Sequence, residues 1–353
     1  MKSILSYALV LWIAACLGCA TGPSSKGPII RVFTEKARVH EVPLETYVMG
    51  VLSKEVPNDW PLETLKAQAV ASRTYVLYRK EHPRDNRFDV TSDTSDQVFE
   101  KKRHYPATIK QAVRETEGET LEYEGKSFEA FFHSCCGGMS ESADHVWKIS
   151  DVPPLESIHP VNSIHNDPYC NQAPSAHWEY SISRENLAQI LHEKNNLKKS
   201  SNWSLEISGR DDQGRVVEIS ISMGDQKNPP TFTGKDFRDL LGPTNIKSTL
   251  FEITSTEDPF VFSGRGSGHG VGLCQWGAKG MGDTGKSYRE ILEFYYPGAQ
   301  SRTVQNKAEI LPQPMETPEE KMEDQTEEEP VKKGKRSRQN GVEWLIESLP
   351  KNP

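Results

Sequence analysis

The sequence predicts an α+β protein, in which helices and strands are mixed rather than alternating in βαβ units. A long helical pattern without breakers covers residues 62–80, and a strictly alternating strand pattern covers residues 215–223. No internal repeat or regular strand–helix–strand alternation connects these segments, which argues against a parallel sheet. The chain of 353 residues is long enough to bury a core in one large domain or two modest ones.

The expected elements begin near residue 29. A strand is expected where Ile29 opens the run Ile-Ile-Arg-Val-Phe. The helix over residues 62–80 follows Pro61, because proline is favoured where helices start. Residues 120–132 place Glu-Gly-Lys between two apolar runs, which predicts a hairpin.

The strand over residues 215–223 follows the turn sequence Asp-Asp-Gln-Gly. Its alternation places Val217, Ile219, Ile221 and Met223 on one face of the strand.

Two short helices are expected near the end of the folded body. The first covers residues 235–241, is capped by Thr233 and ends at Gly242. The second covers residues 287–295 and stops at a Pro-Gly pair.

The N-terminus has the layout of an export signal, because Lys2 precedes an apolar run that small and polar residues follow. Residues 1–19 are predicted to be a lipoprotein signal peptide and residues 20–28 a linker. Cys16 has lipobox spacing, whereas Cys19 precedes a tether-like segment, so either is a candidate for lipidation. A plain signal peptide or an uncleaved anchor stays open. Each version predicts an exported protein, and lipidation predicts an anchor in the cell envelope.

The charge pattern separates a folded body, residues 29–302, from a tail, residues 303–353. The tail has an acidic block followed by a basic one and cannot bury enough apolar surface to fold, so it is predicted to be disordered. The formal net charge of −8 argues against a nucleic-acid-binding protein. No apolar run of about 20 residues follows the N-terminus, which excludes a multipass membrane protein.

Three segments carry the strongest functional signal: VPLETYVMGVLSKEVPNDWPLETLKAQAVASRTYVLYR (residues 42–79), FFHSCCGGMSESADHVW (131–147) and GRGSGHGVGLCQWGAKGMG (264–282). Together they resemble the stage II sporulation protein D (SpoIID)/LytB family of bacterial cell-wall proteins, over most of residues 29–302. The resemblance implies a single domain of mixed helices and antiparallel β-structure with a glycan-binding cleft. It also implies a lytic transglycosylase, which cleaves the MurNAc–GlcNAc bond of peptidoglycan to a 1,6-anhydro-muramic product. Some members are instead non-catalytic enhancers of an N-acetylmuramoyl-L-alanine amidase, and this alternative stays open.

Glu55 is the predicted catalytic residue. It follows a short apolar helix and precedes Val56, Pro57 and Trp60, so partial desolvation is expected to raise its pKa and suit it to general acid catalysis. The resemblance assigns the matching glutamate this role. Most glycoside hydrolases use two carboxylates, whereas a lytic transglycosylase needs one, because the muramic acid 6-hydroxyl is the nucleophile. The alternative is a surface acid paired with a nearby cation.

The helix over residues 62–80 and the glycine-rich third segment supply the predicted substrate contacts. Lys66 and Arg73 lie two turns apart on one helix face, where they would bracket the substrate or orient Glu55, unless they form a solvated stripe. The glycine spacing of the third segment does not match a dinucleotide loop. His269 is either a substrate contact or a structural histidine. The predicted substrate-binding set is Lys66, Gln68, Arg73, Gln97, His269, Gln275 and Trp276.

A zinc site or a disulfide is expected near the second segment. Some members of the resembling family hold zinc in this region, and the candidate ligands here are His133, Cys136, His165 and Cys170. A Cys136–Cys170 disulfide is the alternative. Such a cysteine-rich site would be structural, because hydrolytic zinc keeps an open position for water. Cys274 is expected to be a buried small hydrophobe.

The predicted partners follow from these assignments. They are peptidoglycan glycan strands, a cell-wall amidase, and a membrane reached through the N-terminal lipid. Catalysis by one glutamate requires no cofactor, and no nucleic acid is expected.

Overall fold

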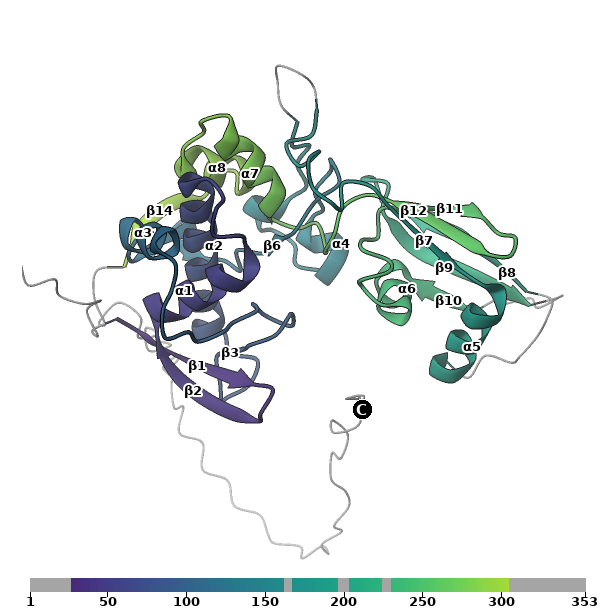
Figure 1. Ribbon diagram of the computed structural model, residues 1–353, viewed down its shortest axis with the longest axis horizontal. Helices are drawn as coiled ribbons and strands as arrows, with labels where there is room; N and C mark the ends of the chain where they lie inside the picture. The colour runs from purple at the N-terminus through teal and green to yellow at the C-terminus, as the bar shows by residue number, and fades with distance from the viewer. Residues whose placement is uncertain (1–26, 162–166, 196–202, 224–229, 305–353) are drawn as a thin grey trace, which may run out of the picture. The chain divides into compact units, whose positions relative to one another are not determined.

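The computed structural model describes residues 27–161, 167–195, 203–223 and 230–304 (Figure 1). The predicted signal peptide, both candidate lipidated cysteines, His165 and the tail from residue 305 lie outside this range. Among the described residues, none of the helices combines the length and apolar character needed to span a membrane.

The protein is a mixed α+β structure, as the sequence predicts, and most strand pairs are antiparallel. The helices are α1 (Leu44–Glu55), α2 (Leu62–Glu81), α3 (Ala107–Glu115), α4 (Ala143–Trp147), α5 (Arg184–Asn195), α6 (Gly234–Leu241), α7 (Gln275–Asp283) and α8 (Tyr288–Tyr295).

The strands form five small sheets within the described residues, and two pairs, β1–β3 and β6–β13, are parallel. The sheet orders are β2-β1-β3, β14-β4-β5, β13-β6, β11-β12-β7 and β10-β9-β8. The strands are β1 (Ile29–Thr34), β2 (Arg38–Pro43), β3 (Val90–Thr91), β4 (Glu119–Tyr123), β5 (Lys126–Ser127), β6 (Phe132–His133), β7 (Trp178–Ile182), β8 (Trp203–Arg210), β9 (Val216–Met223), β10 (Thr231–Thr233), β11 (Phe251–Ser255), β12 (Phe260–Gly264), β13 (Leu273–Cys274) and β14 (Gln300–Thr303).

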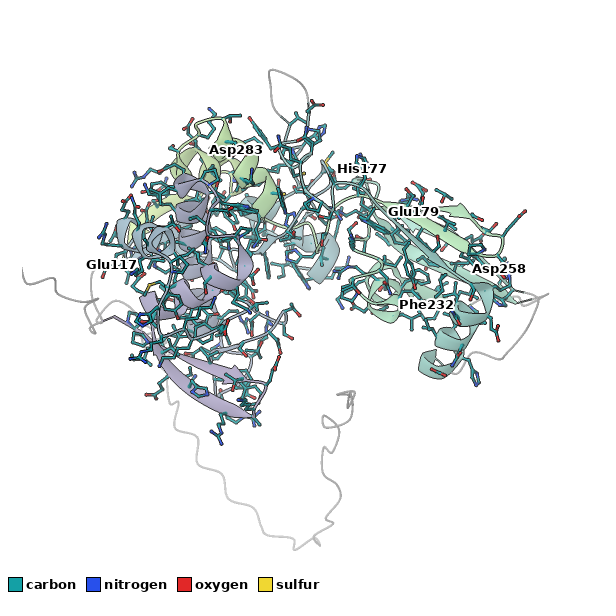
Figure 2. All side chains as sticks on the ribbon, viewed as in Figure 1. Glu117, His177, Glu179, Phe232, Asp258 and Asp283 are labelled. Carbon is teal, nitrogen blue, oxygen red and sulfur yellow. The ribbon has the colours of Figure 1, made fainter. Side chains whose placement is uncertain are left out.

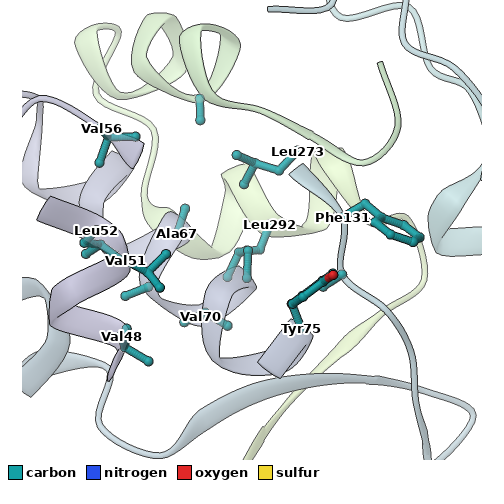
Figure 3. Packing of buried hydrophobic residues seen from close by; sticks show 14 of the residues in the cluster. Val48, Val51, Leu52, Val56, Ala67, Val70, Tyr75, Phe131, Leu273 and Leu292 are labelled. Atoms are coloured by element: carbon teal, nitrogen blue, oxygen red, sulfur yellow. The ribbon is translucent and has the colours of Figure 1, made fainter. Parts of the chain in front are cut away.

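The first hydrophobic core is built around α2. This helix is buried on nearly all of its faces, with Ala67, Ala69 and Val70 completely enclosed, so it is a central core helix rather than an amphipathic surface helix. Figure 3 shows residues of α1, α2 and α8 packing together with Leu273 and Phe131, which brings the first and third sequence segments into one core.

The second core lies within residues 178–262 and is made by α5, α6 and the strands β7 to β12. Phe237 from α6 packs between Phe251 and Phe262 of the β11–β12 pair. Exposed carboxylates such as Glu179 and Asp258 lie on the outer surface of this unit (Figure 2).

The expected hairpin and short helices are confirmed. β4 and β5 are joined by Glu124 and Gly125, both with positive φ, as a tight hairpin requires. The Thr233 side chain accepts a hydrogen bond from Asp236 at the start of α6, and Ser287 and Glu290 form a capping box at the start of α8.

The shared face predicted for Val217, Ile219 and Ile221 of β9 is wrong at Val217, and the side chain of Met223 lies outside the described residues. Ile219 and Ile221 are fully buried, but Val217 is 43% exposed. The register explains this: Gly209 pairs with Glu218 and Arg210 pairs with Val216, so Val217 is the extra residue of a β-bulge. The bulge resets the alternation, and Val216 takes the buried position instead.

Candidate active site and thiol cluster

Glu55 is the last residue of α1, where the chain leaves the helix. The buried side chains of Val56 and Trp60 follow it, and α2 starts at Leu62. An anion gains nothing from the helix dipole at a C-terminal end. The buried neighbours partly desolvate the Glu55 carboxyl, while the side chain as a whole stays half-buried and is not enclosed.

Both oxygens of Glu55 accept a hydrogen bond. The Val98 backbone N–H donates to Oε1 at 2.8 Å, and the Gln275 side chain donates to Oε2 at 3.3 Å. Burial raises the pKa of Glu55 above the value of a free glutamate, and the two hydrogen bonds oppose part of that rise. The site therefore combines a carboxyl that keeps its proton to higher pH with two donors that stabilise the anion once the proton has left.

Gln97 and Gln275 are both buried polar side chains near this carboxyl. Gln275 is the first residue of α7 and contacts Glu55 directly. Gln97 accepts a hydrogen bond from the Tyr47 hydroxyl at 3.1 Å and fixes the loop that presents the Val98 N–H. The structure thus gives Gln97 a positioning contact, and its predicted contact with the substrate stays a prediction.

Trp276 lies beside Gln275 and is half-buried. Its indole packs edge-on against Trp60, with ring centroids 5.0 Å apart, and Lys279 lies 5.9 Å from its ring centre. The backbone N–H of Trp276 donates to the Ser134 carbonyl at 3.0 Å and anchors the start of α7. Part of this residue stays exposed, and its predicted contact with the substrate stays a prediction.

The substrate contacts predicted for the polar residues of α2 are not supported. Lys66 is held by Glu63 and Glu115, each at 2.7 Å. Gln68 is 1% exposed and donates to the Ser72 hydroxyl. None of these side chains makes a hydrogen bond or ion pair with Glu55 in the described part of the chain.

Arg73 is completely buried and pairs with Glu45 through two contacts, at 3.0 Å from Nε and 2.6 Å from Nη2. Its Nη1 donates to the Glu119 carbonyl at 2.9 Å. A guanidinium without exposed surface has no direct access to a glycan chain here, so the structure gives Arg73 a structural contact and its predicted substrate role stays a prediction. Arg73 instead joins α1, α2 and β4.

We predict that Arg73→Met destabilises the protein by about 3 kcal/mol, because removing one partner leaves the other charge uncompensated, although Glu45 stays partly solvated. Urea unfolding measures this loss. Arg87→Met is the matched control, since the Arg87–Asp85 ion pair lies on the surface, and its unfolding curve should match that of the wild type. If the two variants have the same urea unfolding curve, the Arg73–Glu45 ion pair contributes nothing to the free energy of unfolding.

His269 uses both ring nitrogens on the backbone. Nδ1 accepts from the Val271 N–H at 3.1 Å, so Nε2 carries the proton and donates to the Phe132 carbonyl at 3.0 Å. Burial lowers the pKa of His269 well below its usual range, so the ring is neutral. The substrate hydrogen bond predicted for His269 therefore lacks a free nitrogen, and the alternative of a structural histidine fits the geometry.

A cluster of buried thiols surrounds His133. One ligand atom each from His133, Cys136 and Cys274 lie within 4.8 Å of one another, and the Cys136 and Cys170 sulfurs are 3.5 Å apart. All four cysteines of the described residues are free thiols, so the alternative of a Cys136–Cys170 disulfide is not what the structure contains.

The His133 ring is oriented as metal-ligating histidines are. Nδ1 lies 3.1 Å from the Val271 carbonyl, which can only accept, so Nδ1 carries the proton and Nε2 has a free lone pair. Nε2 is buried and has no hydrogen-bond partner. Burial lowers the pKa of His133 to about 4, so the ring stays neutral. Three thiols and one neutral imidazole nitrogen fit tetrahedral zinc.

Cys274 is the member of this cluster that the sequence analysis did not identify. It was expected to pack as a small hydrophobe, and it does cap α7, where its sulfur accepts from the Gly277 N–H at 3.3 Å. The parallel pairing of β6 with β13 places it opposite His133. A cysteine left over after the predicted Cys136–Cys170 pair was the available signal in the sequence.

Arg215 brings a buried positive charge to this cluster. Its Nη2 donates to the carbonyls of Cys136 and Met139, at 3.2 Å and 2.9 Å, and its Nε lies 3.4 Å from Glu141 Oε2. Burial raises the pKa of Glu141 to about 7. A cation at this place offsets the negative charge that thiolates around a metal would carry.

Comparisons with known proteins agree with this architecture. Residues 34–123 match the profile of the stage II sporulation protein family, and residues 140–272 match a domain family of unknown function. The chain is 38% identical over 261 residues to an uncharacterised protein of Brachyspira hyodysenteriae, covering 74% of this chain and 67% of the relative.

Two relatives from Bacillus subtilis have names that state a role. The stage II sporulation protein D of that organism is 30% identical over 310 residues, covering 80% of this chain and 83% of the relative. An amidase enhancer is 30% identical over 290 residues, covering 70% of this chain and 39% of the relative. With its first and third segments meeting at Glu55, and with these matches along most of its length, the chain belongs to the stage II sporulation protein D family.

Proposed function

We propose that the protein is a lytic transglycosylase that cleaves the MurNAc–GlcNAc bond of peptidoglycan glycan strands during cell-wall remodelling. The observation that supports this function is the half-buried Glu55, whose pKa burial raises and whose two oxygens are held by Val98 and Gln275. The test is to incubate the purified protein with peptidoglycan, with and without stem peptides. Mass spectrometry should then find 1,6-anhydro-muramic ends, and products hydrolysed by water would contradict the proposal.

In the proposed mechanism Glu55 acts twice. The protonated carboxyl first donates its proton to the glycosidic oxygen as the bond to the muramic anomeric carbon breaks. The resulting carboxylate, which the Val98 N–H and Gln275 stabilise, then removes the proton of the muramic 6-hydroxyl as that oxygen bonds to the anomeric carbon. Each bond that breaks is replaced by one that forms, and Glu55 returns to its protonated state without water.

The second candidate function is a non-catalytic enhancer of a cell-wall amidase. It is favoured by the 30% identity to a protein named amidase enhancer. The two functions predict different results with Glu55→Gln. An enhancer keeps its effect on an added amidase in this variant, whereas the transglycosylase loses its anhydro products.

We predict that Gln275→Leu moves the alkaline limb of the kcat/KM profile to higher pH. The general acid must be protonated in the free enzyme, so activity falls as pH rises through the pKa of Glu55. The Gln275 hydrogen bond favours the anion and lowers that pKa, so its removal raises it further. Asp283→Asn, at the exposed C-terminal end of α7, is the control and should leave the profile in place. An alkaline limb that moves to lower pH in Gln275→Leu, or that does not move, contradicts the role of Glu55 as the general acid.

We also propose a structural zinc ion held by His133, Cys136, Cys170 and Cys274. The free buried lone pair of His133 and the neighbouring sulfurs support it. The ion would supply folding energy, and the four ligands would close its coordination, so no step of the reaction passes through it.

Export and lipid anchoring in the cell envelope stay proposals from the sequence. The names of the Bacillus subtilis relatives support a place at the cell wall. Labelling cells with a clickable fatty acid tests the anchor, since Cys19→Ala or Cys16→Ala should abolish the label. If the double variant Cys16→Ala/Cys19→Ala still carries the fatty-acid label, neither cysteine is the lipidated residue.

A further inference from the structure

A short irregular segment, residues 97–100, carries the Val98 N–H that donates to Glu55. The segment belongs to no helix or strand, so the hydrogen-bond ladders of regular structure do not fix its place. A backbone donor can orient a carboxylate only if its own segment is held firmly by its neighbours. The contacts between this segment and α1 therefore decide how well Glu55 is held.

Tyr47, about two turns before Glu55 on α1, holds the first residue of the segment. Its side chain is completely buried, and its hydroxyl donates to Gln97 Oε1 at 3.1 Å. The amide nitrogen of Gln97 in turn donates to the Ser72 carbonyl of α2 at 3.4 Å. Burial raises the pKa of Tyr47 well above its usual range, so the hydroxyl keeps the proton that it donates. The start of the segment is thus tied to both helices.

Gly50 provides the space into which the rest of the segment packs. The Phe99 ring stacks on the Tyr47 ring, with centroids 5.1 Å apart. A Cβ atom at Gly50 would lie 2.6 Å from Phe99 Cδ2 and 2.9 Å from the Glu100 carbonyl oxygen, closer than non-bonded atoms approach without displacing one another. The segment can lie this close to α1 only because residue 50 has no side chain.

Neither helix stability nor backbone conformation explains a glycine at this place. Gly50 lies in the interior of α1, where glycine is less favourable than alanine. Gly50 is also absent from the described residues with positive φ, so a left-handed backbone does not require glycine here. The close approach of Phe99 and Glu100 is the reason that the structure supplies.

We propose that Tyr47 and Gly50 are positioning residues for the general acid. They seat residues 97–100 on α1, so that the Val98 N–H meets Glu55 Oε1 at 2.8 Å. The assignment rests on the proposed function, because it gives these two residues a part in the reaction and not only in packing. Neither residue touches the reacting atoms, so both act through the segment.

Displacing the segment should change how Glu55 titrates. Burial raises the pKa of Glu55, and of the two hydrogen bonds that oppose the rise, that of Val98 has the larger effect and that of Gln275 the smaller. Without the Val98 N–H the carboxylate loses its stronger donor. The pKa of Glu55 should then rise further, and the carboxylate formed during the reaction would be less well held.

The test introduces Gly50→Ala into the full chain and measures the pKa of Glu55 from the NMR titration of its carboxyl carbon, which is assigned by its loss in Glu55→Gln. The pKa should rise by more than in Gln275→Leu, and kcat should fall by about 10²-fold as the acid loses its orientation. If the segment did not pack on Gly50, alanine would only stabilise α1. A higher melting temperature with an unchanged pKa would therefore overturn the proposal.

Tyr47→Phe is the milder variant, because it keeps the buried ring and removes only the hydroxyl. It should raise the pKa of Glu55 by less than Gly50→Ala does. Tyr288→Phe is its matched control, since it removes a buried hydroxyl that donates to Glu119 at 2.9 Å in the same core. The control should leave the pKa of Glu55 unchanged, even where it lowers the melting temperature. Equal rises in both variants would show a general loosening of the core and would reject the positioning role.

A double variant tests whether the Phe99 ring transmits the effect. Phe99→Ala removes the ring atoms that a Cβ at Gly50 would meet. Gly50→Ala should therefore raise the pKa of Glu55 by less in the Phe99→Ala protein than in the wild type, because contacting residues are not additive. Fully additive changes would mean that Gly50 does not act through this ring, which contradicts the proposal.

The positioning role and the proposed function can fail separately, because NMR reads the pKa of Glu55 without turnover. If the wild type makes no anhydro product while Gly50→Ala raises the pKa, the seating of the segment stands and the transglycosylase does not. If the wild type makes the product while Gly50→Ala changes neither pKa nor kcat, the transglycosylase stands and the positioning role does not.

Discussion

Glu55→Gln is expected to lower the rate of glycan cleavage by about 10²–10⁴, the contribution of a positioned general acid–base group. The substitution keeps the shape of the side chain but removes the proton that Glu55 would donate. Gln275 and the Val98 N–H stay in place around the new amide. The measurement is kcat for release of anhydro-muramic products.

The same variant should keep or raise the melting temperature at neutral pH. The pKa of Glu55 is raised in the folded protein, so the folded state binds this proton more tightly than the unfolded chain does. Stability therefore falls as pH rises from the unfolded to the folded pKa, and a neutral glutamine escapes this loss. Full activity in Glu55→Gln would refute the mechanism, and a large drop in melting temperature would mean that lost folding explains the lost rate.

Removal of zinc is expected to lower the stability of the protein before it changes the chemistry. Protein purified without a histidine tag should contain one zinc ion, and a strong chelator should lower the melting temperature. A ligand whose free concentration is 1,000 times its Kd stabilises the folded state by about 4.1 kcal/mol. Structural zinc sites bind with larger free energies than this, so the loss of stability on chelation should be at least as large. Elemental analysis and thermal melts measure both effects.

The cysteines allow a matched comparison. Cys274→Ser should lose the metal, whereas Cys135→Ser should keep it, because Cys135 is the buried thiol outside the proposed set and contacts the Cys170 carbonyl at 4.0 Å. Cobalt substitution then tests for three thiolate ligands through charge-transfer absorption. Equal metal loss in both variants would overturn the ligand assignment. If the purified protein contains no zinc and its cysteines are free thiols, the proposed zinc site is wrong.

The sequence predicted the class, several elements and the place of Glu55, because these depend on local patterns. Helix α2, the β4–β5 hairpin and the cap of α6 each follow from residues next to one another. The desolvation of Glu55 was also readable, since its apolar neighbours adjoin it in the chain.

What the sequence did not reveal depends on partners far away in the chain. Arg73 looked like a ligand for substrate because Glu45, 28 residues earlier, could not be known to pair with it. Cys274 looked inert because its position opposite His133 arises from the β6–β13 pairing. Val217 was misplaced because a bulge cannot be read from alternation alone.

The β6–β13 pair also has a consequence for how much variation the chain tolerates. It joins His133 to Cys274 and so closes a long loop that contains the whole second core. Doubling the length of a flexible loop adds only about 0.6 kcal/mol of closure entropy, and a loop that folds on its own behaves as a rigid insert. Length changes in the outer loops of the second core should therefore be tolerated, provided that the two strands still meet and that Cys136, Cys170 and Arg215, which lie within the same loop, keep their contacts.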